Sequence, residues 1–347
     1  MAAGAKVHRV ALPAPSRIVR PARPVRSVRP DRTAWCSLAL TAAFAAPAGL
    51  CLLPLALLAR HALGLPLAAG YGAWLAGSLC YTVRPVQLAL ARLLWPMRRP
   101  TEAEARRLAP VWGRVARSAQ VAGDRFRIRV VDLPEVNAHS VGRNVICVTA
   151  GALEQLGDRE LAGVLAHELG HHLRMHTSAA AFLVWVLLPL QGVALVGVVL
   201  AYPFAVAAHS LEGSGAAAAA VPARCLKGAA GALRTVFGAP GLAAFAAKNA
   251  AGRVAEYRVD AFAVEVGLGA ELLSALRWFA AGEAAGARAR AHTRALVPGR
   301  ARHAAVRVPR PTHPPLDRRM ARIAARTAVK TAVAEPETAK CSIPGLR

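Results

Sequence analysis

Three long stretches of the chain contain no charged residue. They cover residues 33–59, 62–83 and 177–208. A helix needs about 20 mainly apolar residues to cross the hydrocarbon core of a bilayer, so each stretch is long enough to span a membrane. The third is longer than one untilted span requires. A soluble protein rarely contains three such stretches, and the pattern therefore predicts a multi-pass membrane protein with three or four transmembrane helices.

The remaining segments have the patterns of a folded domain. Residues 126–131 alternate between apolar and polar side chains and predict a strand, and residues 143–149 predict a second strand. A capping-box spacing at Thr101 predicts the start of a helix. Apolar residues recur at helical spacing over 158–175, and 253–266 has a second helical pattern. We expect an α+β, mainly helical fold with a small sheet.

Basic residues are concentrated before the first apolar stretch. The net charge is +25, and residues 1–32 contain seven arginines and one lysine against a single aspartate. The positive-inside rule places this disordered tail in the cytoplasm, where it would contact anionic lipid. The first two spans then form a hairpin, and residues 101–176 are cytoplasmic. Because no aromatic platform or recognition helix accompanies the arginines, we do not expect nucleic acid as a partner.

The strongest chemical signal is the sequence His-Glu-Leu-Gly-His at 167–171. A helix advances about 100° per residue, so His167 and His171 lie on one face and both reach one metal ion. Glu168 beside them is placed to take a proton from the attacking water. This is the H-E-x-x-H arrangement of zinc proteases. Asp158 is the expected N-cap of the helix.

Catalytic zinc usually has three protein ligands and one water. The second helical pattern contains Glu256 and Asp260, four residues apart on one face. We expect Glu256 to be the third ligand. Asp260, one turn further on, is suited to accept the second ring proton of a ligand histidine, which fixes the tautomer of that histidine. Six scattered cysteines without a C-x-x-C pair predict neither a disulfide framework nor a structural zinc site.

Five segments in the same order resemble the integral-membrane zinc metalloproteases of the HtpX type, which are relatives of the CAAX prenyl endopeptidases. They are residues 133–138, 146–153, 167–171, 256–261 and 313–319. The resemblance covers residues 126–325. It implies a zincin-like (gluzincin) catalytic domain with one Zn²⁺ per chain. The chain departs from the family at His139, where an apolar aromatic residue is usual, and over 216–251, which is poor in Leu, Ile and Phe.

The position of Glu256 constrains the topology. Since Glu256 must reach a metal held by His167 and His171, the intervening chain crosses the membrane an even number of times. Either 177–208 crosses and 226–247 returns, or 177–208 turns back on itself near 189–192. The resemblance favours two crossings, which makes four membrane helices in total.

These considerations divide the chain into six parts. They are a cytoplasmic tail (1–32), a transmembrane hairpin (33–95), a first catalytic part (101–176), a membrane part (177–250), a second catalytic part (251–325) with a mobile loop (284–312), and a tail (326–347). The N-terminus and the active site are expected on the cytoplasmic side of the cell membrane.

Further residues receive provisional roles. His313 or Arg319 is the candidate for stabilising the developing oxyanion. The strand at 143–149 is expected to bind the substrate backbone as an added strand, with Asn137 and Ala138 at its edge. A loop holding Asn137 would join the two strands, and a plain turn is an equally good interpretation of that residue.

The leading hypothesis is a membrane-embedded zinc endopeptidase acting on proteins or peptides. A role in membrane-protein quality control is implied by the resemblance alone. A prenyl-protein endopeptidase would need a large lipid chamber, for which three or four spans are too few. A non-enzymatic membrane sensor would be expected to carry an exterior ligand domain, and the exterior loops are short. The substrate and the oligomeric state stay open.

Overall fold

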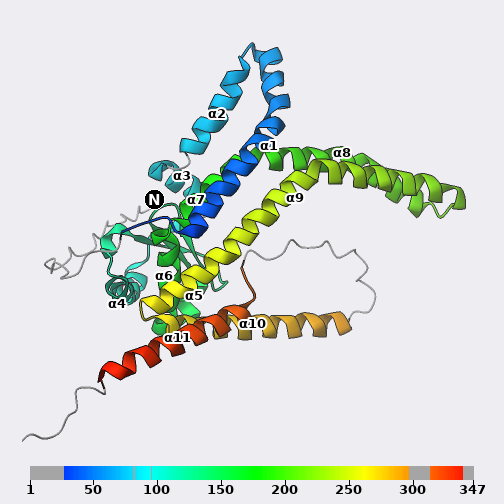
Figure 1. The fold of residues 1–347 in the computed structure, drawn as a ribbon. Coiled ribbons are helices and arrows are strands. Elements are labelled where there is room, and N and C mark those ends of the chain that lie inside the picture. The colour runs from blue at the N-terminus through cyan, green and yellow to red at the C-terminus, as the bar shows by residue number, and fades with distance from the viewer. Residues whose placement is uncertain (1–26, 81–82, 95, 297–312, 339–347) are drawn as a thin grey trace, which may run out of the picture.

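The computed structural model describes residues 27–80, 83–94, 96–296 and 313–338. Two helical hairpins, α1–α2 and α8–α9, project from a body that contains the sheet and the other long helices (Figure 1). In chain order the elements are α1 (Arg32–Leu63), α2 (Leu67–Cys80), α3 (Arg84–Leu94), β1 (Met97–Arg98), α4 (Glu102–Ala119), η1 (Gly123–Arg125), β2 (Arg127–Val131), β3 (Ala138–Val141), β4 (Val145–Thr149), α5 (Ala150–Gln155), α6 (Asp158–Leu173), α7 (His176–Val186), α8 (Leu188–Gly213), η2 (Ala217–Ala219), α9 (Ala220–Glu265), α10 (Gly269–Leu296) and α11 (Leu316–Thr338).

The sheet has the order β1-β2-β4-β3. β2 and β4 are parallel, whereas the two outer pairs are antiparallel. Both predicted strands are confirmed, but the predicted loop between them was wrong in part, because residues 138–141 form β3 and pair with β4. Gly142 makes the tight turn between them at a φ of 57°, a conformation that glycine adopts without strain. β3 is thus an outer strand of the sheet, and β4 is an inner one.

The predicted helix at 158–175 is confirmed as α6, which is buried on nearly all sides at the centre of the body. Its N-cap is Gly157, not Asp158; Asp158 lies in the first turn, where its carboxylate pairs with Arg107 at 2.8 Å. A Cβ on Gly163 would lie 2.3 Å from the backbone nitrogen of Leu272, so only glycine lets α6 pack this closely on α10. Close packing on all sides fixes the orientation of the helix that carries the histidines.

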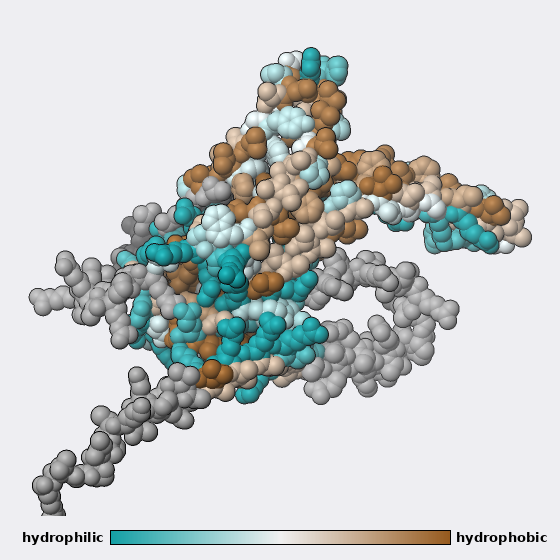
Figure 2. Space-filling view, viewed as in Figure 1, coloured by the Kyte–Doolittle hydropathy of each residue, from teal (hydrophilic) through white to brown (hydrophobic). Residues whose placement is uncertain are grey.

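Three described helices are long and apolar enough to cross a membrane: α1, α8 and the helical segment Ala217–Glu265 that contains α9. Within the described part of the second apolar stretch, residues 62–63 end α1 and the only other helix is α2, whose 14 residues extend about 21 Å, less than the ~30 Å hydrocarbon core. Hydrophobic side chains predominate along both hairpins, with hydrophilic ones at their tips, and hydrophilic side chains gather on the body (Figure 2).

The third apolar stretch does not turn back at 189–192. It divides into α7 and α8 near Leu187, and α8 continues to Gly213, from which α9 returns beside it. The sequence of α9 is poor in large apolar residues because small ones pack against α8: Ala223, Ala230 and Ala244 are buried. One continuous helix of 46 residues therefore connects the hairpin to the body.

Two predicted boundaries were wrong. The loop expected over 284–312 is helical as far as Leu296, and 297–312 lie outside the described residues. The tail expected from 326 is part of α11 as far as Thr338. Of the basic tail, residues 1–26 are not described, and Arg29 donates its backbone N–H to the carbonyl of Leu173 at the end of α6.

Candidate metal centre

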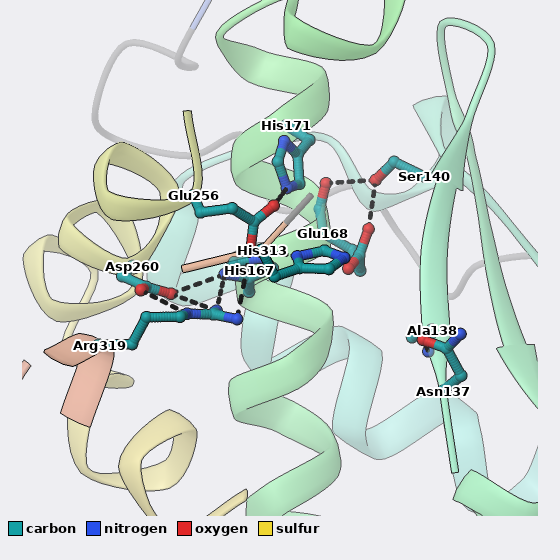
Figure 3. Close-up of polar contacts among 10 residues, drawn as sticks. All are labelled: Asn137, Ala138, Ser140, His167, Glu168, His171, Glu256, Asp260, His313 and Arg319. Atoms are coloured by element: carbon teal, nitrogen blue, oxygen red, sulfur yellow. Dashed lines mark hydrogen bonds and ion pairs between the residues drawn. The ribbon is translucent and has the colours of Figure 1, made fainter. Parts of the chain in front are cut away.

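The two histidines of α6 and one glutamate of α9 meet in the interior of the body (Figure 3). Nε2 of His167 lies 3.5 Å from Oε2 of Glu256, and Nε2 of His171 lies 3.3 Å from Oε1. One potential ligand atom from each residue lies within 4.8 Å of the other two. The predicted ligand set thus comes together in a cluster that one ion can bridge.

The residues of this cluster fit a divalent metal. The side chain of Glu256 is 7% exposed, and Oε2 makes no well-aligned hydrogen bond although three cationic or imidazole groups surround it. A buried acceptor of this kind is costly unless a donor or a cation satisfies it. Two imidazole nitrogens and a carboxylate suit Zn²⁺, and they also suit other divalent metals.

The surrounding carboxylates favour positive charge at His167. Burial alone would lower the pKa of this imidazole, but its hydrogen bond with Asp260 and the nearby carboxylate of Glu256 outweigh burial and raise the pKa to about 10. A metal ion supplies positive charge at the same place, and it would compete with the proton.

Asp260 lies one turn beyond Glu256 on α9 and faces the other ring nitrogen of His167. Its Oδ1 is 3.0 Å from Nδ1 of His167, which leaves Nε2 directed at Glu256. Arg319 from α11 donates to both oxygens of Asp260, at 2.7 and 2.9 Å. Asp260 therefore lies where a carboxylate that orients His167 would lie.

Arg319 does not occupy the position that its expected role requires. It is buried behind the cluster, with Nη1 3.3 Å from Oε2 of Glu256, and it does not line the cleft in front. This side chain is the countercharge to Asp260 and Glu256. His313 does line the cleft, and its Nδ1 lies 2.9 Å from Oε2 of Glu256, an interaction that raises the pKa of the imidazole.

Glu168 points into the cleft beside the two histidines. Oε2 of its carboxylate is 2.7 Å from Oγ of Ser140 on β3, and the same hydroxyl is 2.8 Å from the backbone oxygen of Glu168. The hydroxyl proton of Ser140 can be donated to either oxygen. Sequence reasoning missed Ser140, because its only signal was its place next to His139 in a segment taken for a loop.

The cleft in front of the cluster has a volume of about 360 Å³. Its walls are β3, α6, α9 and the first turns of α1 and α7, including Thr33, Ala180 and Gly252. It therefore extends from the predicted metal ligands to the bases of the membrane helices.

Asn137 and Ala138 line the same cleft at the start of β3. Oδ1 of Asn137 accepts the N–H of Ala138 at 2.8 Å, and Oγ1 of Thr149 accepts the N–H of Asn137 at 2.9 Å. Asn137 thus fixes the chain where β3 begins. The strand at 143–149 cannot take an added strand, because β2 and β3 occupy both of its edges; the outer edge of β3 is available instead.

Two further histidines, His172 and His176, lie close to the cluster in the sequence, and both are buried. Nε2 of His172 lies 2.9 Å from the carbonyl of Val145, which ties α6 to the sheet. Nε2 of His176 lies 2.9 Å from Oδ1 of Asp31, the N-cap of α1.

Comparison with known proteins agrees with this centre. The model of the family described as "Peptidase family M48" matches residues 102–327, which contain every side chain of the cluster. A curated relative, "Protease HtpX homolog" from Acidiphilium cryptum (strain JF-5), is 49% identical over 49 residues. That match covers 13% of this chain and 17% of the relative, so the chain is aligned over much less than two thirds of the relative's length. The family match covers well over half of the chain, and the chain belongs to peptidase family M48.

Proposed function

We propose that this protein is a membrane-embedded zinc endopeptidase that hydrolyses polypeptides at the cleft between β3 and α6. The observation that carries the proposal is the cluster of His167, His171 and Glu256, with the carboxylate of Glu168 directed into the adjoining cleft. Zn²⁺, when bound by these three residues, supplies the Lewis acid that polarises the peptide carbonyl and lowers the pKa of water.

The side chains of the cleft have separate roles in this proposal. Glu168 accepts a proton from the attacking water and passes it to the departing amine. Ser140 holds the carboxylate of Glu168 in one orientation through its hydroxyl. Asp260 and Arg319 together keep His167 oriented, and the exposed imidazole of His313 donates to the developing oxyanion.

The substrate is proposed to be an extended polypeptide. The outer edge of β3 lines the cleft, and backbone groups at a free strand edge bind an extended chain as an added strand. The cleft reaches the first turns of α1 and α7, so segments of other membrane proteins that emerge from the bilayer have a direct route to it. This location supports a role in membrane-protein quality control, and the basic residues before α1 favour the cytoplasmic side.

An assay of the full chain in detergent tests the proposal. Wild type should cleave casein or a quenched fluorescent peptide, lose activity with a chelator and regain it with Zn²⁺. Glu168→Gln should remain folded and inactive. If wild type binds zinc but cleaves neither substrate, nor itself, the chain is better described as a non-enzymatic sensor. If Glu168→Gln cleaves at the wild-type rate, Glu168 is not the base.

A further inference from the structure

A second concave surface lies between the end of α9 and α11. It has a volume of about 990 Å³ and shares no lining residue with the cleft at the candidate metal centre. We call it the α9–α11 groove. Its charged lining consists of five cationic side chains and a single acid: Arg174, Arg258, Arg322, Arg326, Lys330 and Glu265.

The cations of the groove come from facing helices. Arg322, Arg326 and Lys330 are spaced by four residues and therefore share one face of α11. Arg258 faces them from α9, and Arg174 approaches from the end of α6. Five positive charges thus border one groove.

Three of these cations already have partners. Arg174 and Arg258 lie 3.6 and 3.7 Å from Oδ2 of Asp31, and Arg174 also reaches Glu265. Lys330 donates to the last carbonyls of α9, at 2.8 and 2.9 Å.

Arg322 and Arg326 have no such partner among the described residues, and together with Lys330, whose carbonyl partners are neutral, they give the groove its excess charge. The guanidinium of Arg322 lies 4.0 Å from the centre of the Tyr257 ring, an arrangement that fixes it in place and leaves its N–H donors available. No acidic side chain of the described residues pairs with Arg322 or Arg326 in an ion pair within 4 Å. The free N–H donors of the groove can therefore bind an anion with several acceptor oxygens.

The groove adjoins the expected membrane boundary. Asp31, which Arg174 and Arg258 contact, is the N-cap of α1 and directly precedes the uncharged stretch that begins at residue 33. Two exposed valines line the groove beside its cations: Val254 is 51% exposed and Val329 is 65% exposed. Cationic side chains with apolar neighbours at the base of a membrane helix match the surface of a lipid headgroup region.

We propose that the α9–α11 groove binds the phosphate-bearing headgroup of an anionic phospholipid from the leaflet at the base of α1. Arg322 and Arg326 contact the phosphate, and Val254, which lies toward the membrane hairpin on α9, contacts the glycerol and the upper acyl chain. A lipid is favoured over an acidic peptide because two arginines of the groove contact the N-cap of α1 and because an exposed valine lies beside the cations on the side of the membrane hairpin. Bound lipid would connect α9, which carries Glu256, to the membrane surface.

The test is calorimetric titration of the full chain in an uncharged detergent with dihexanoylphosphatidylglycerol. One saturable site is expected, with dihexanoylphosphatidylcholine binding at least about tenfold more weakly. Arg322→Ala/Arg326→Ala should weaken phosphatidylglycerol binding at least about tenfold without changing the unfolding temperature. Arg117→Ala/Arg127→Ala, which removes the same charge from exposed positions outside the groove, should bind as wild type.

Several results would overturn the proposal. Equal losses in the two double variants would show a general charge effect and no site. Equal affinity for inorganic phosphate alone would show a site for a free anion. Tighter binding of a glutamate-rich peptide, dependent on the same arginines, would show a surface for an acidic protein. None of these measurements depends on the proposed peptidase activity.

Discussion

The hydroxyl of Ser140 provides a quantitative test of how the cleft prepares Glu168. In Ser140→Ala the carboxylate of Glu168 loses the donor that lies 2.7 Å from Oε2. A hydrogen bond to a charged group contributes about 1.5–3 kcal/mol, and each 1.36 kcal/mol of barrier is about tenfold in rate. Since the bond orients the base and touches no substrate, kcat should fall about ten- to hundredfold with KM unchanged.

Peptide hydrolysis measured over a range of substrate concentrations, with zinc content determined on the same sample, separates the possible outcomes. Ser140→Thr keeps the hydroxyl on a strand residue and should restore most of kcat. A Ser140→Ala variant with wild-type kcat and full zinc would refute the role assigned to this contact. A variant that lost zinc in proportion to activity would show that Ser140 supports the fold of the centre and not the base.

Three further perturbations test other contacts. Asp260→Asn removes the charge that faces Nδ1 of His167 and should weaken zinc binding about 10- to 100-fold in a chelator competition; unchanged affinity would contradict the orienting role. Gly163→Ala places a Cβ 2.3 Å from the backbone of α10 and should lower the free energy of unfolding by about 1–3 kcal/mol, measured as a lower unfolding temperature in detergent. The control Gly192→Ala, with open space around its Cβ, should change the unfolding temperature little. Asp31→Asn tests pH dependence. Burial raises the pKa of Asp31, but hydrogen bonds with His176 and the N-terminus of α1 outweigh it and lower the pKa to about 2. Because the pKa of Asp31 is lower in the folded state, its ionised carboxylate stabilises the fold at pH values above the ordinary pKa of 3.8. This stabilisation is about 1 kcal/mol after screening by water, and it is lost as the pH falls toward 2. The unfolding temperatures of wild type and Asp31→Asn should therefore differ at pH 6, and the difference should shrink as the pH falls from 3.8 toward 2. A constant difference would show that the ionised carboxylate does not matter.

The pairs of residues in the candidate metal centre that lie on one helix could be predicted from helical periodicity alone. His167 and His171 share a face because they are four apart, and so do Glu256 and Asp260. Their meeting depends on α6 packing against α9, which no local pattern encodes. It could be inferred because a metal site with only two protein ligands is incomplete.

Contacts made by tertiary packing alone could not be predicted. Ser140 reaches Glu168 only because β3 lies against α6, and the segment of β3 looked like a loop since its four residues show little alternation. Arg319 was one of two candidates for stabilising the oxyanion, whereas the packing of α11 directs it at Asp260. The return helix α9 was hard to recognise because alanine and glycine lower its hydropathy while permitting close contact with α8.

The zinc content of Glu256→Ala tests the central claim most directly. Elemental analysis of the full chain purified in detergent should give one zinc ion per wild-type chain and much less than one for Glu256→Ala. Glu265→Ala is a suitable control, since it changes an exposed glutamate near the end of the same helix. A Glu256→Ala protein that retained one zinc ion per chain would contradict the ligand set on which the proposed function depends.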